Sequence, residues 1–439
     1  MRLKSSCILI LALGALMAAN LCRAQQMVVT PDKSNGVYQV GDTVHWTVEW
    51  KGNSSAPAAY YSLKSGGLTD VGHGDLSFSN NVATLESKFD KPNTMLIEVD
   101  WQQKNKTNRV WGGAVAAPDQ IKPATPSPDD FDAFWKAKLE ELEKIPANPR
   151  LEKVDIGRPG VVYWKITLDN INGTHIQGQL ARPATGEKFP ALLVPQWAGV
   201  YGLQKSWVTD RAKDGWLALN IEAHDIPIDK PAAYYTELYS TGALKNYWNI
   251  GNDDRNKSYY LRMYLSCVQA MKYLKSRPDW DGKTFVVMGQ SQGGQQTLML
   301  AGLCPKDVTA ALALVPAASD MLAPEVGRAS GFPNWYFNTT GKDPKKVHEA
   351  SRYYDPANFA SRIKCPVLIA LGLHDEQLAP PSSILAAVNE ITSPKEVIIL
   401  PNSGHQNEHG SQEPFFHRAY YDWLPALKEG KPAPVQQSN

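Results

Sequence analysis

The pattern of apolar and polar positions divides the chain into two parts. Over residues 27–117, apolar side chains alternate with polar ones, as at Val44, Trp46, Val48 and Trp50. A period of two residues is typical of strands that bury one face. Clusters of Gly, Asn, Asp and Ser separate these runs and predict hairpin turns. About seven short strands of this kind indicate an immunoglobulin-like β-sandwich over residues 27–117.

From residue 189 onward, longer apolar runs alternate with amphipathic stretches. Apolar side chains recur on one side of Tyr259–Leu274, as they do in a helix. Alternating strands and helices indicate a mainly parallel sheet with helices on both faces, which we expect within an α/β unit over residues 118–432. The expected strands are Ala191–Val194, Trp216–Ile221, Thr284–Met288, Ala310–Val315, Pro366–Leu371 and Val397–Leu400.

The segment between the two parts, residues 114–128, is rich in alanine and proline and is interpreted as a linker. A helix is expected directly after it, with Ser127 as the N-terminal cap and Pro128 in the first position. A chain of 439 residues exceeds what a single core usually holds, which favours two domains.

Residues 1–24 have the composition of a secretory signal peptide. Arg2 and Lys4 precede an apolar run that ends near Ala19, and residues 22–24 form a small-x-small cleavage site. The apolar run is too short to cross a bilayer and no other segment qualifies, so we expect no membrane span. We therefore expect an exported protein, either periplasmic or secreted.

Charge and cysteine content narrow the classes of partner. The chain has 45 basic and 44 acidic residues and a formal net charge of +1. It lacks the basic blocks that bind nucleic acids or anionic membranes, and a neutral substrate fits this balance. Cys267, Cys304 and Cys365 lie in apolar stretches without metal-binding spacing, so we expect no metal or other cofactor. Buried thiols are favoured, and one bridge between Cys267 and Cys304 stays open.

The strongest chemical signal is residues 289–293, a GxSxG sequence between an expected strand and a helical stretch. A serine on such a sharp turn needs glycine two positions to either side, because a Cβ there would collide with the adjoining backbone. Ser291 is therefore the expected nucleophile. The backbone N–H of Gln292 points the same way and is expected to be one donor for the oxyanion.

Proteins with this elbow place an acid and then a histidine at the ends of later strands. Asp375 and His405 follow the last two expected strands, in this order. We expect Asp375 to orient His405, and His405 to take the proton of Ser291 as the serine attacks an ester carbonyl. The competing candidates are Glu376 for the acid, and His409, His417, His374 and His224 for the base.

Other strand ends supply candidates for the rest of the site. The N–H of Ala198, which follows the first long parallel strand, is the expected second oxyanion donor. His224 ends the next strand and is expected to border the cleft. Trp335 and the aromatic residues of segment 226–256 are candidates for lining a sugar-binding mouth, or for packing a lid.

A competing signature overlaps the expected base. Residues 405–409 read HxxEH, the inverted motif of some zinc proteases. That motif requires a helix that turns both histidines toward one metal, whereas Gly404, Asn407 and Gly410 favour no helix. We therefore prefer the serine mechanism.

Several further stretches are more specific than the elbow alone. They are Pro128–Trp135, Gly289–Gly294, Tyr353–Asp355, Asn358–Ala360, Cys365–Leu368, and Asp375 with Pro380–Ser382. In these stretches, across residues 128–430, the sequence resembles the acetyl xylan esterase and cephalosporin C deacetylase family, carbohydrate esterase family 7. The resemblance implies an α/β-hydrolase fold and deacetylation of carbohydrate. It also implies Ser291, Asp375 and His405 as nucleophile, acid and base, and the N–H groups of Gln292 and Ala198 as oxyanion donors.

The sequence departs from the family pattern at three places. The usual Arg-Gly-Gln is replaced by residues 222–224, His-Gly-Tyr by residues 196–198, and His-Glu by residues 405–406. Trp197 thus stands where the family has glycine, and is a candidate for contacting the substrate and narrowing the acyl site. With its added β-domain, the chain is expected to be a divergent member.

Together these observations predict an exported serine esterase that removes acetyl groups from a carbohydrate ester, such as acetylated xylan or xylo-oligosaccharides. A general carboxylesterase or peptidase with the same fold and the same three residues is the alternative. A non-catalytic glycan-binding protein is a third hypothesis, against which the intact Ser291, Asp375 and His405 argue.

Overall fold

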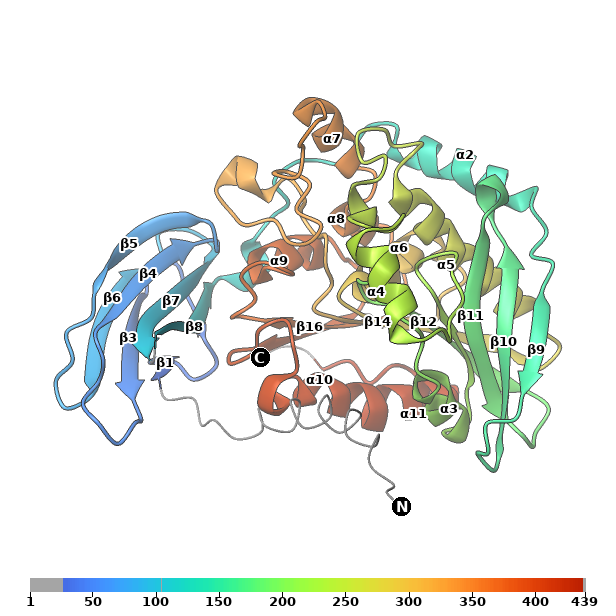
Figure 1. Ribbon diagram of the computed structural model, residues 1–439, viewed down its shortest axis with the longest axis horizontal. Coiled ribbons are helices and arrows are strands. Elements are labelled where there is room, and N and C mark those ends of the chain that lie inside the picture. Colours follow the sequence, from blue (N-terminus) through green and yellow to red (C-terminus); the bar gives the residue numbers. More distant parts are fainter. Residues whose placement is uncertain (1–26, 104, 437–439) are drawn as a thin grey trace, which may run out of the picture.

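The computed structural model describes residues 27–103 and 105–436 of the 439-residue chain. The expected signal peptide, residues 1–24, lies outside the described residues. An N-terminal β-region stands beside a larger part built on a long mixed sheet (Figure 1).

The described residues of the β-region form two sheets, with strand orders β1-β3-β6 and β2-β8-β7-β4-β5. Trp46 from the first sheet and Ile97 from the second are fully buried in one shared core. The alternation in β3 places Val44, Trp46 and Val48 on the buried face. The predicted β-sandwich is therefore confirmed. Its strands are β1 (Met27–Pro31), β2 (Val37–Tyr38), β3 (Thr43–Trp50), β4 (Ala59–Ser65), β5 (Thr69–Asp75), β6 (Val82–Lys88), β7 (Asn93–Gln103) and β8 (Lys106–Ala116).

The connection to the larger part differs from the prediction at both ends. Residues 114–116 belong to β8 rather than to a linker, because they pair with β7. Helix α2 (Phe131–Glu143) begins at Phe131 instead of Pro128, since the carbonyl of Pro128 accepts the N–H of Phe131 in a turn that precedes the helix. The Ser127 hydroxyl is buried without a hydrogen-bond partner among the described residues and caps no helix.

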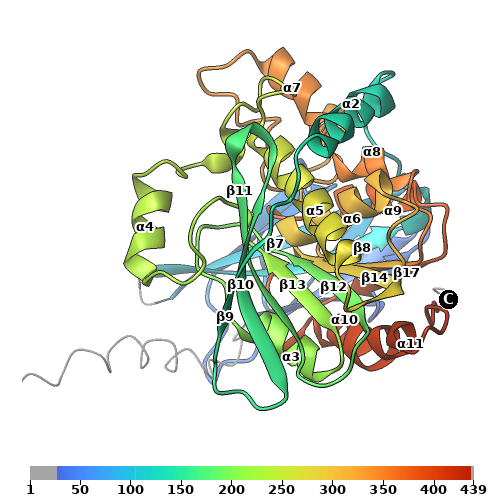
Figure 2. The same cartoon turned by 90° about the vertical axis from the view of Figure 1, so that its right-hand side faces the viewer.

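The described residues beyond the connection build a nine-stranded sheet of order β17-β16-β15-β14-β12-β13-β11-β10-β9. Neighbouring strands from β13 to β17 are parallel, which confirms the predicted α/β architecture. The other three strands form an antiparallel edge, seen toward the viewer in Figure 2. The strands are β9 (Arg150–Val154), β10 (Val161–Asp169), β11 (His175–Pro183), β12 (Phe189–Pro195), β13 (Leu217–Ile221), β14 (Trp280–Gln290), β15 (Ala310–Leu314), β16 (Val367–Gly372) and β17 (Lys395–Leu400).

Helices cover both faces of this sheet (Figure 1). α5 and α6 pack on β12 and β14 on one face, and α3 packs on the other near β11 and β13, with α10 and α11 beside it. Within the described part of the chain, no helix has the length and apolar character needed to cross a membrane. The helices besides α2 are α3 (Ser206–Lys213), α4 (Ala232–Ser240), α5 (Tyr259–Ser276), α6 (Gln292–Leu303), α7 (Pro344–Ser351), α8 (Pro356–Ala360), α9 (Pro381–Asn389), α10 (Glu413–His417) and α11 (Leu424–Lys428).

Candidate active site

Three strand ends bring the predicted nucleophile, acid and base into contact. Ser291 follows β14, Asp375 follows β16, and His405 lies in the loop after β17. Since these strands are parallel members of one sheet, their carboxyl ends meet at one edge. His405 Nε2 lies 2.8 Å from Ser291 Oγ, and His405 Nδ1 lies 2.6 Å from Asp375 Oδ2. This geometry suits a serine nucleophile with a hydrogen-bonded base and an orienting acid.

The backbone around Ser291 has the strain of a nucleophile elbow. Ser291 has φ 55° and ψ −122°, a combination that residues with a side chain rarely adopt. A Cβ on Gly289 would lie 2.3 Å from the carbonyl oxygen of Gly293, and a Cβ on Gly293 would lie 2.6 Å from that of Pro195. Only glycine fits at both positions. The serine lies at the start of α6 and is 8% exposed.

The acid is held by its own loop. Asp375 Oδ1 accepts the N–H groups of Leu378 at 3.1 Å and Ala379 at 3.0 Å, while Oδ2 faces His405. These two hydrogen bonds fix the orientation of the carboxyl group toward His405. Glu376, the competing acid, turns toward Glu98 of the β-region. Burial, together with that neighbouring carboxyl, raises the pKa of Glu376 to about 7.

The competing bases and the zinc motif do not have the required geometry. Burial lowers the pKa of His374 to about 4, and its Nε2 has no hydrogen-bond partner among the described residues. His409 has φ 53° and lies in a short 3₁₀ turn, so the segment from His405 to His409 is not a helix. The described residues also contain no cluster of three or more potential metal ligands.

Hydrogen bonds of Tyr247 connect the two segments that hold the predicted oxyanion donors, the start of α6 and the loop after β12. Gln292 is the first residue of α6, where a backbone N–H has no partner within the helix. Ala198 lies in the loop after β12, beside Gly199. The hydroxyl of Tyr247 donates to Gln292 Oε1 at 2.6 Å and accepts the N–H of Gly199 at 3.3 Å. Tyr247 therefore fixes the spacing between the start of α6 and the loop after β12 that holds Ala198 and Gly199, here called the oxyanion loop. The sequence around Tyr247 did not reveal this role.

His224 lies behind the oxyanion loop rather than at the cleft. It is fully buried, with Nε2 2.9 Å from the carbonyl of Gly199 and Nδ1 2.8 Å from the hydroxyl of Tyr259. Burial lowers the pKa of His224 to about 4, so the ring is neutral and Nε2 carries the proton donated to Gly199. Its complete burial argues against the expected direct contact with substrate and indicates a role in holding the loop.

Trp335 is likewise fully buried. Its indole N–H donates to the carbonyl of Trp248, and its ring packs on Tyr260 and Tyr354. This aromatic cluster packs the segment around Trp335 against Tyr260 of α5. Of the two functions considered for Trp335, the position fits packing rather than contact with sugar.

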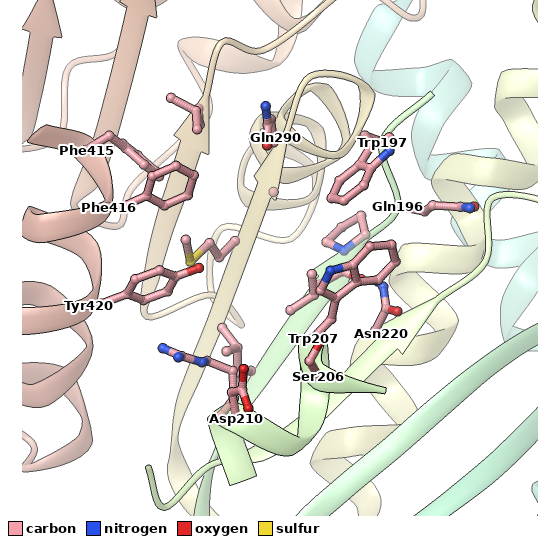
Figure 3. A pocket seen from close by; sticks show the side chains of 17 residues that line it. Gln196, Trp197, Ser206, Trp207, Asp210, Asn220, Gln290, Phe415, Phe416 and Tyr420 are labelled. Carbon is pink, nitrogen blue, oxygen red and sulfur yellow. The ribbon is translucent and has the colours of Figure 1, made fainter. Parts of the chain in front are cut away.

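Trp197 faces a cavity of about 330 Å³ on the other side of the loop (Figure 3). Its ring packs edge-on against Trp207 of α3, with ring centres 4.6 Å apart, and Phe415, Phe416 and Tyr420 line the opposite wall. Ser291 and His405 do not line this cavity. The side chain therefore lines a cavity together with Gly289 and Gln290, and its expected role in narrowing the acyl site stays a prediction.

Gln412 is a supporting residue that the sequence did not reveal. Its side-chain amide donates to the carbonyls of Gly404 at 3.3 Å and His405 at 3.1 Å, and the residue is fully buried. It fixes the backbone that carries the base. A glutamine seven positions after a histidine carries no recognisable signal, because only the loop conformation brings the two together.

The question of a disulfide is settled by the structure. Cys267, Cys304 and Cys365 are buried free thiols. Burial is the main cause that raises the pKa of each of them, so the thiols are inert in the interior.

Comparisons with known proteins identify the family of the chain. The family model for acetyl xylan esterase (AXE1) matches residues 118–427. Acetyl esterase Axe7A from Xylanibacter ruminicola is 38% identical over 292 residues, which cover 66% of this chain and 66% of that protein. The match thus spans just under two thirds of the relative's length.

Two solved structures are also similar. Acetyl xylan esterase from Paenibacillus sp. R4 is 26% identical with a TM-score of 0.58, covering 72% of this chain and 98% of that one. Acetyl xylan esterase 1 from Thermoanaerobacterium sp. JW/SL YS485 is 22% identical with a TM-score of 0.57. The match covers 68% of this chain and 96% of that chain, and it supports the fold. The chain therefore belongs to the acetyl xylan esterase family of carboxylic-ester hydrolases and has its α/β-hydrolase fold.

Proposed function

We propose that this protein is an exported serine esterase that removes acetyl groups from carbohydrate such as acetylated xylan. The observation that carries the proposal is the hydrogen-bonded chain from Asp375 through His405 to Ser291. It lies in a chain that belongs to the acetyl xylan esterase family. The name of the 38% identical relative, an acetyl esterase, supports acetyl as the acyl group.

Acylation begins when Ser291 Oγ attacks the ester carbonyl carbon and passes its proton to His405 Nε2. Asp375 accepts a hydrogen bond from Nδ1–H of the imidazolium and stabilises its positive charge. The N–H groups of Gln292 and Ala198 donate to the oxyanion of the tetrahedral intermediate. Collapse of this intermediate breaks the bond to the sugar oxygen, which takes the proton from Nε2 and leaves as an alcohol.

Deacylation repeats these steps with water. His405 takes a proton from a water molecule that attacks the acetyl-serine, and the same two N–H groups hold the second oxyanion. The proton then returns to Ser291 Oγ as the acetate is released. Each proton moves through Nε2, which lies within hydrogen-bond distance of Ser291.

Replacing Ser291 by alanine tests the mechanism. We expect release of acetate from acetylated xylo-oligosaccharides and aryl acetates to fall below a few per cent of wild type, with an almost unchanged melting temperature, because the hydroxyl contributes little packing. Ser361→Ala, at an exposed position remote from the site, is the matched control. Substantial activity in the Ser291 variant would refute the assignment.

The acyl-chain profile tests acetyl specificity against a general carboxylesterase. We expect kcat/KM to be highest for p-nitrophenyl acetate and to fall for butyrate and octanoate, because a short acyl pocket excludes added methylenes. A maximum at butyrate or octanoate would favour the general carboxylesterase.

Export is proposed from the composition of residues 1–24. N-terminal sequencing of protein recovered from the periplasm or medium of a bacterial host tests it. A chain that stays in the cytoplasm with its first residues intact would contradict export.

A further inference from the structure

A pocket of about 740 Å³ lies between the β-region and the candidate active site. One wall is formed by residues 28–30 of β1 and residues 110–111 of β8, and the other by the loops 374–378 and 402–411. Asp375 and His405 are both part of the second wall. The β-region therefore faces the two residues that activate the serine.

Tight contacts fix the β-region on one side of the acid loop. A Cβ on Gly113 of β8 would lie 2.5 Å from the Cβ of Leu373, and one on Gly36 would lie 2.6 Å from the Cδ1 of the same leucine. Such contacts leave no room for sliding, because the interfering atoms belong to a buried side chain. Leu373 directly precedes the loop 374–378.

Hydrogen bonds fix the β-region on the other side of this loop. The N–H of Ala329 donates to the carbonyl of Gly66 at 2.8 Å, and the hydroxyl of Thr69 donates to the carbonyl of Gly327 at 2.9 Å. With contacts on both sides, the wall formed by the β-region is preorganised. A ligand in the pocket would not have to order it.

The lining has the chemistry of a site for a neutral, hydroxyl-rich ligand. The Trp111 side chain is partly exposed and lines the pocket, and its indole interacts with Glu376, another lining residue. The buried Nε2 of His374 has no hydrogen-bond partner among the described residues. Five more lining side chains form no hydrogen bond among the described residues, namely Thr30, Asn402, Gln406, Glu408 and His409. An aromatic surface with several free polar groups is suited to a sugar ring, which has apolar C–H faces and hydroxyl edges.

The position of the pocket matches the direction in which the leaving group extends. The sugar oxygen must reach His405 Nε2 to be protonated, so the sugar lies on the His405 side of the ester. His405 and the adjacent Gln406 line the pocket, whereas Ser291 does not. A saccharide that extends from the ester past these two residues enters the space beneath the β-region.

We propose that this pocket binds the sugar rings of an acetylated polysaccharide next to the scissile ester. The N-terminal β-region is then one wall of the substrate site, in addition to being a structural unit. The inference rests on the proposed deacetylase function, and it identifies the carbohydrate side of that site.

A matched pair of lysine substitutions tests this wall. Thr30 is exposed and lines the pocket. Thr84 is also exposed on the same sheet but does not line the pocket; Thr47 of β3 pairs with Thr30 on one side and with Thr84 on the other. Thr30→Lys places a long charged side chain in the pocket, and Thr84→Lys makes the same change outside it. The readout is kcat/KM for acetylated xylo-oligosaccharides divided by kcat/KM for p-nitrophenyl acetate, which has no sugar.

We expect Thr30→Lys to lower this ratio at least tenfold and Thr84→Lys to leave it within twofold of wild type. His409→Ala removes a free polar side chain of the opposite wall and should lower the ratio three- to tenfold. If Thr30→Lys melts several degrees below wild type, His409→Ala replaces it as the test of the pocket. In the inactive Ser291→Ala protein, calorimetry should show weaker binding of the oligosaccharide when Thr30→Lys is added. Unchanged ratios in both pocket variants would overturn the inference, whereas a wild-type protein that cleaves neither substrate would overturn the proposed function instead.

Discussion

Replacing Glu376 by glutamine should make thermal stability less dependent on pH. Burial and the neighbouring Glu98 raise the pKa of Glu376 from 4.5 to about 7, whereas the pKa of Glu98 is lowered, against its burial, by the hydrogen bond with Glu376 and by Lys64 at 2.6 Å and Arg109 at 3.7 Å. At a pH between 4.5 and about 7, the folded protein holds a proton on Glu376 that the unfolded chain has lost. Stability contributed by this proton is therefore complete below pH 4.5 and decreases as the pH rises toward 7.

The size of the effect follows from this shift. A change from 4.5 to about 7 would correspond to roughly 3 kcal/mol at 1.36 kcal/mol per pH unit. Glu376 is only partly buried, so solvent screening reduces this to about 1–2 kcal/mol. For a protein of this size we expect a difference in melting temperature of roughly 2 °C.

Calorimetric melting at pH 5 and pH 8 provides the measurement. The decrease in melting temperature between these conditions should be about 2 °C smaller in Glu376→Gln than in wild type, because glutamine binds no proton. Glu187→Gln, at an exposed position, is the matched control and should behave as wild type does. Equal pH dependence in wild type and Glu376→Gln would refute the shared proton between the acid loop and the β-region.

Three further predictions concern the site itself. Tyr247→Phe should lower kcat/KM about tenfold while the protein stays folded, since it removes the hydroxyl that joins Gln292 to Gly199; unchanged kinetics would contradict this positioning role. Gly293→Ala should lose activity and about 1–3 kcal/mol of stability, because the new Cβ would lie 2.6 Å from the carbonyl oxygen of Pro195; a normal melting temperature with full activity would show that the elbow tolerates a side chain. Dialysis against EDTA should leave ester hydrolysis unchanged, and a loss restored by zinc would revive the HxxEH interpretation.

The sequence was sufficient for those features that depend on order along the chain. Parallel strands end at one edge of a sheet, so the positions of Ser291, Asp375 and His405 after three strands were enough to predict that they meet. The two glycines of the elbow were predictable for the same reason, because the steric requirement there is local.

Features that depend on the orientation of a side chain could not be predicted in this way. His224 and Trp335 follow strands or lie in an aromatic insertion, and either position is compatible with a cleft or with the core. The structure buries both completely. Trp197 follows the same rule, since a loop residue can turn to either side of the sheet. The bond from Gln412 to the His405 loop depends on a fold of that loop which no local pattern specifies.

The sequence pattern predicted the hydrophobic core of the β-region but not its interface with the larger part. The alternating pattern and the two hydrophobic cores are consistent with two domains, Val115 of β8 packs in the core of the larger part, and the boundary at residue 117 remains a prediction. The interface follows no such pattern, because it is made by glycines that admit close contact and by a pair of carboxyl groups from distant strands and loops. Gly113 and Glu98 of the β-region meet Leu373 and Glu376, which lie immediately on either side of the residue pair His374 and Asp375. The β-region therefore packs against the residues on both sides of the proposed acid, and this packing supports the loop that carries Asp375.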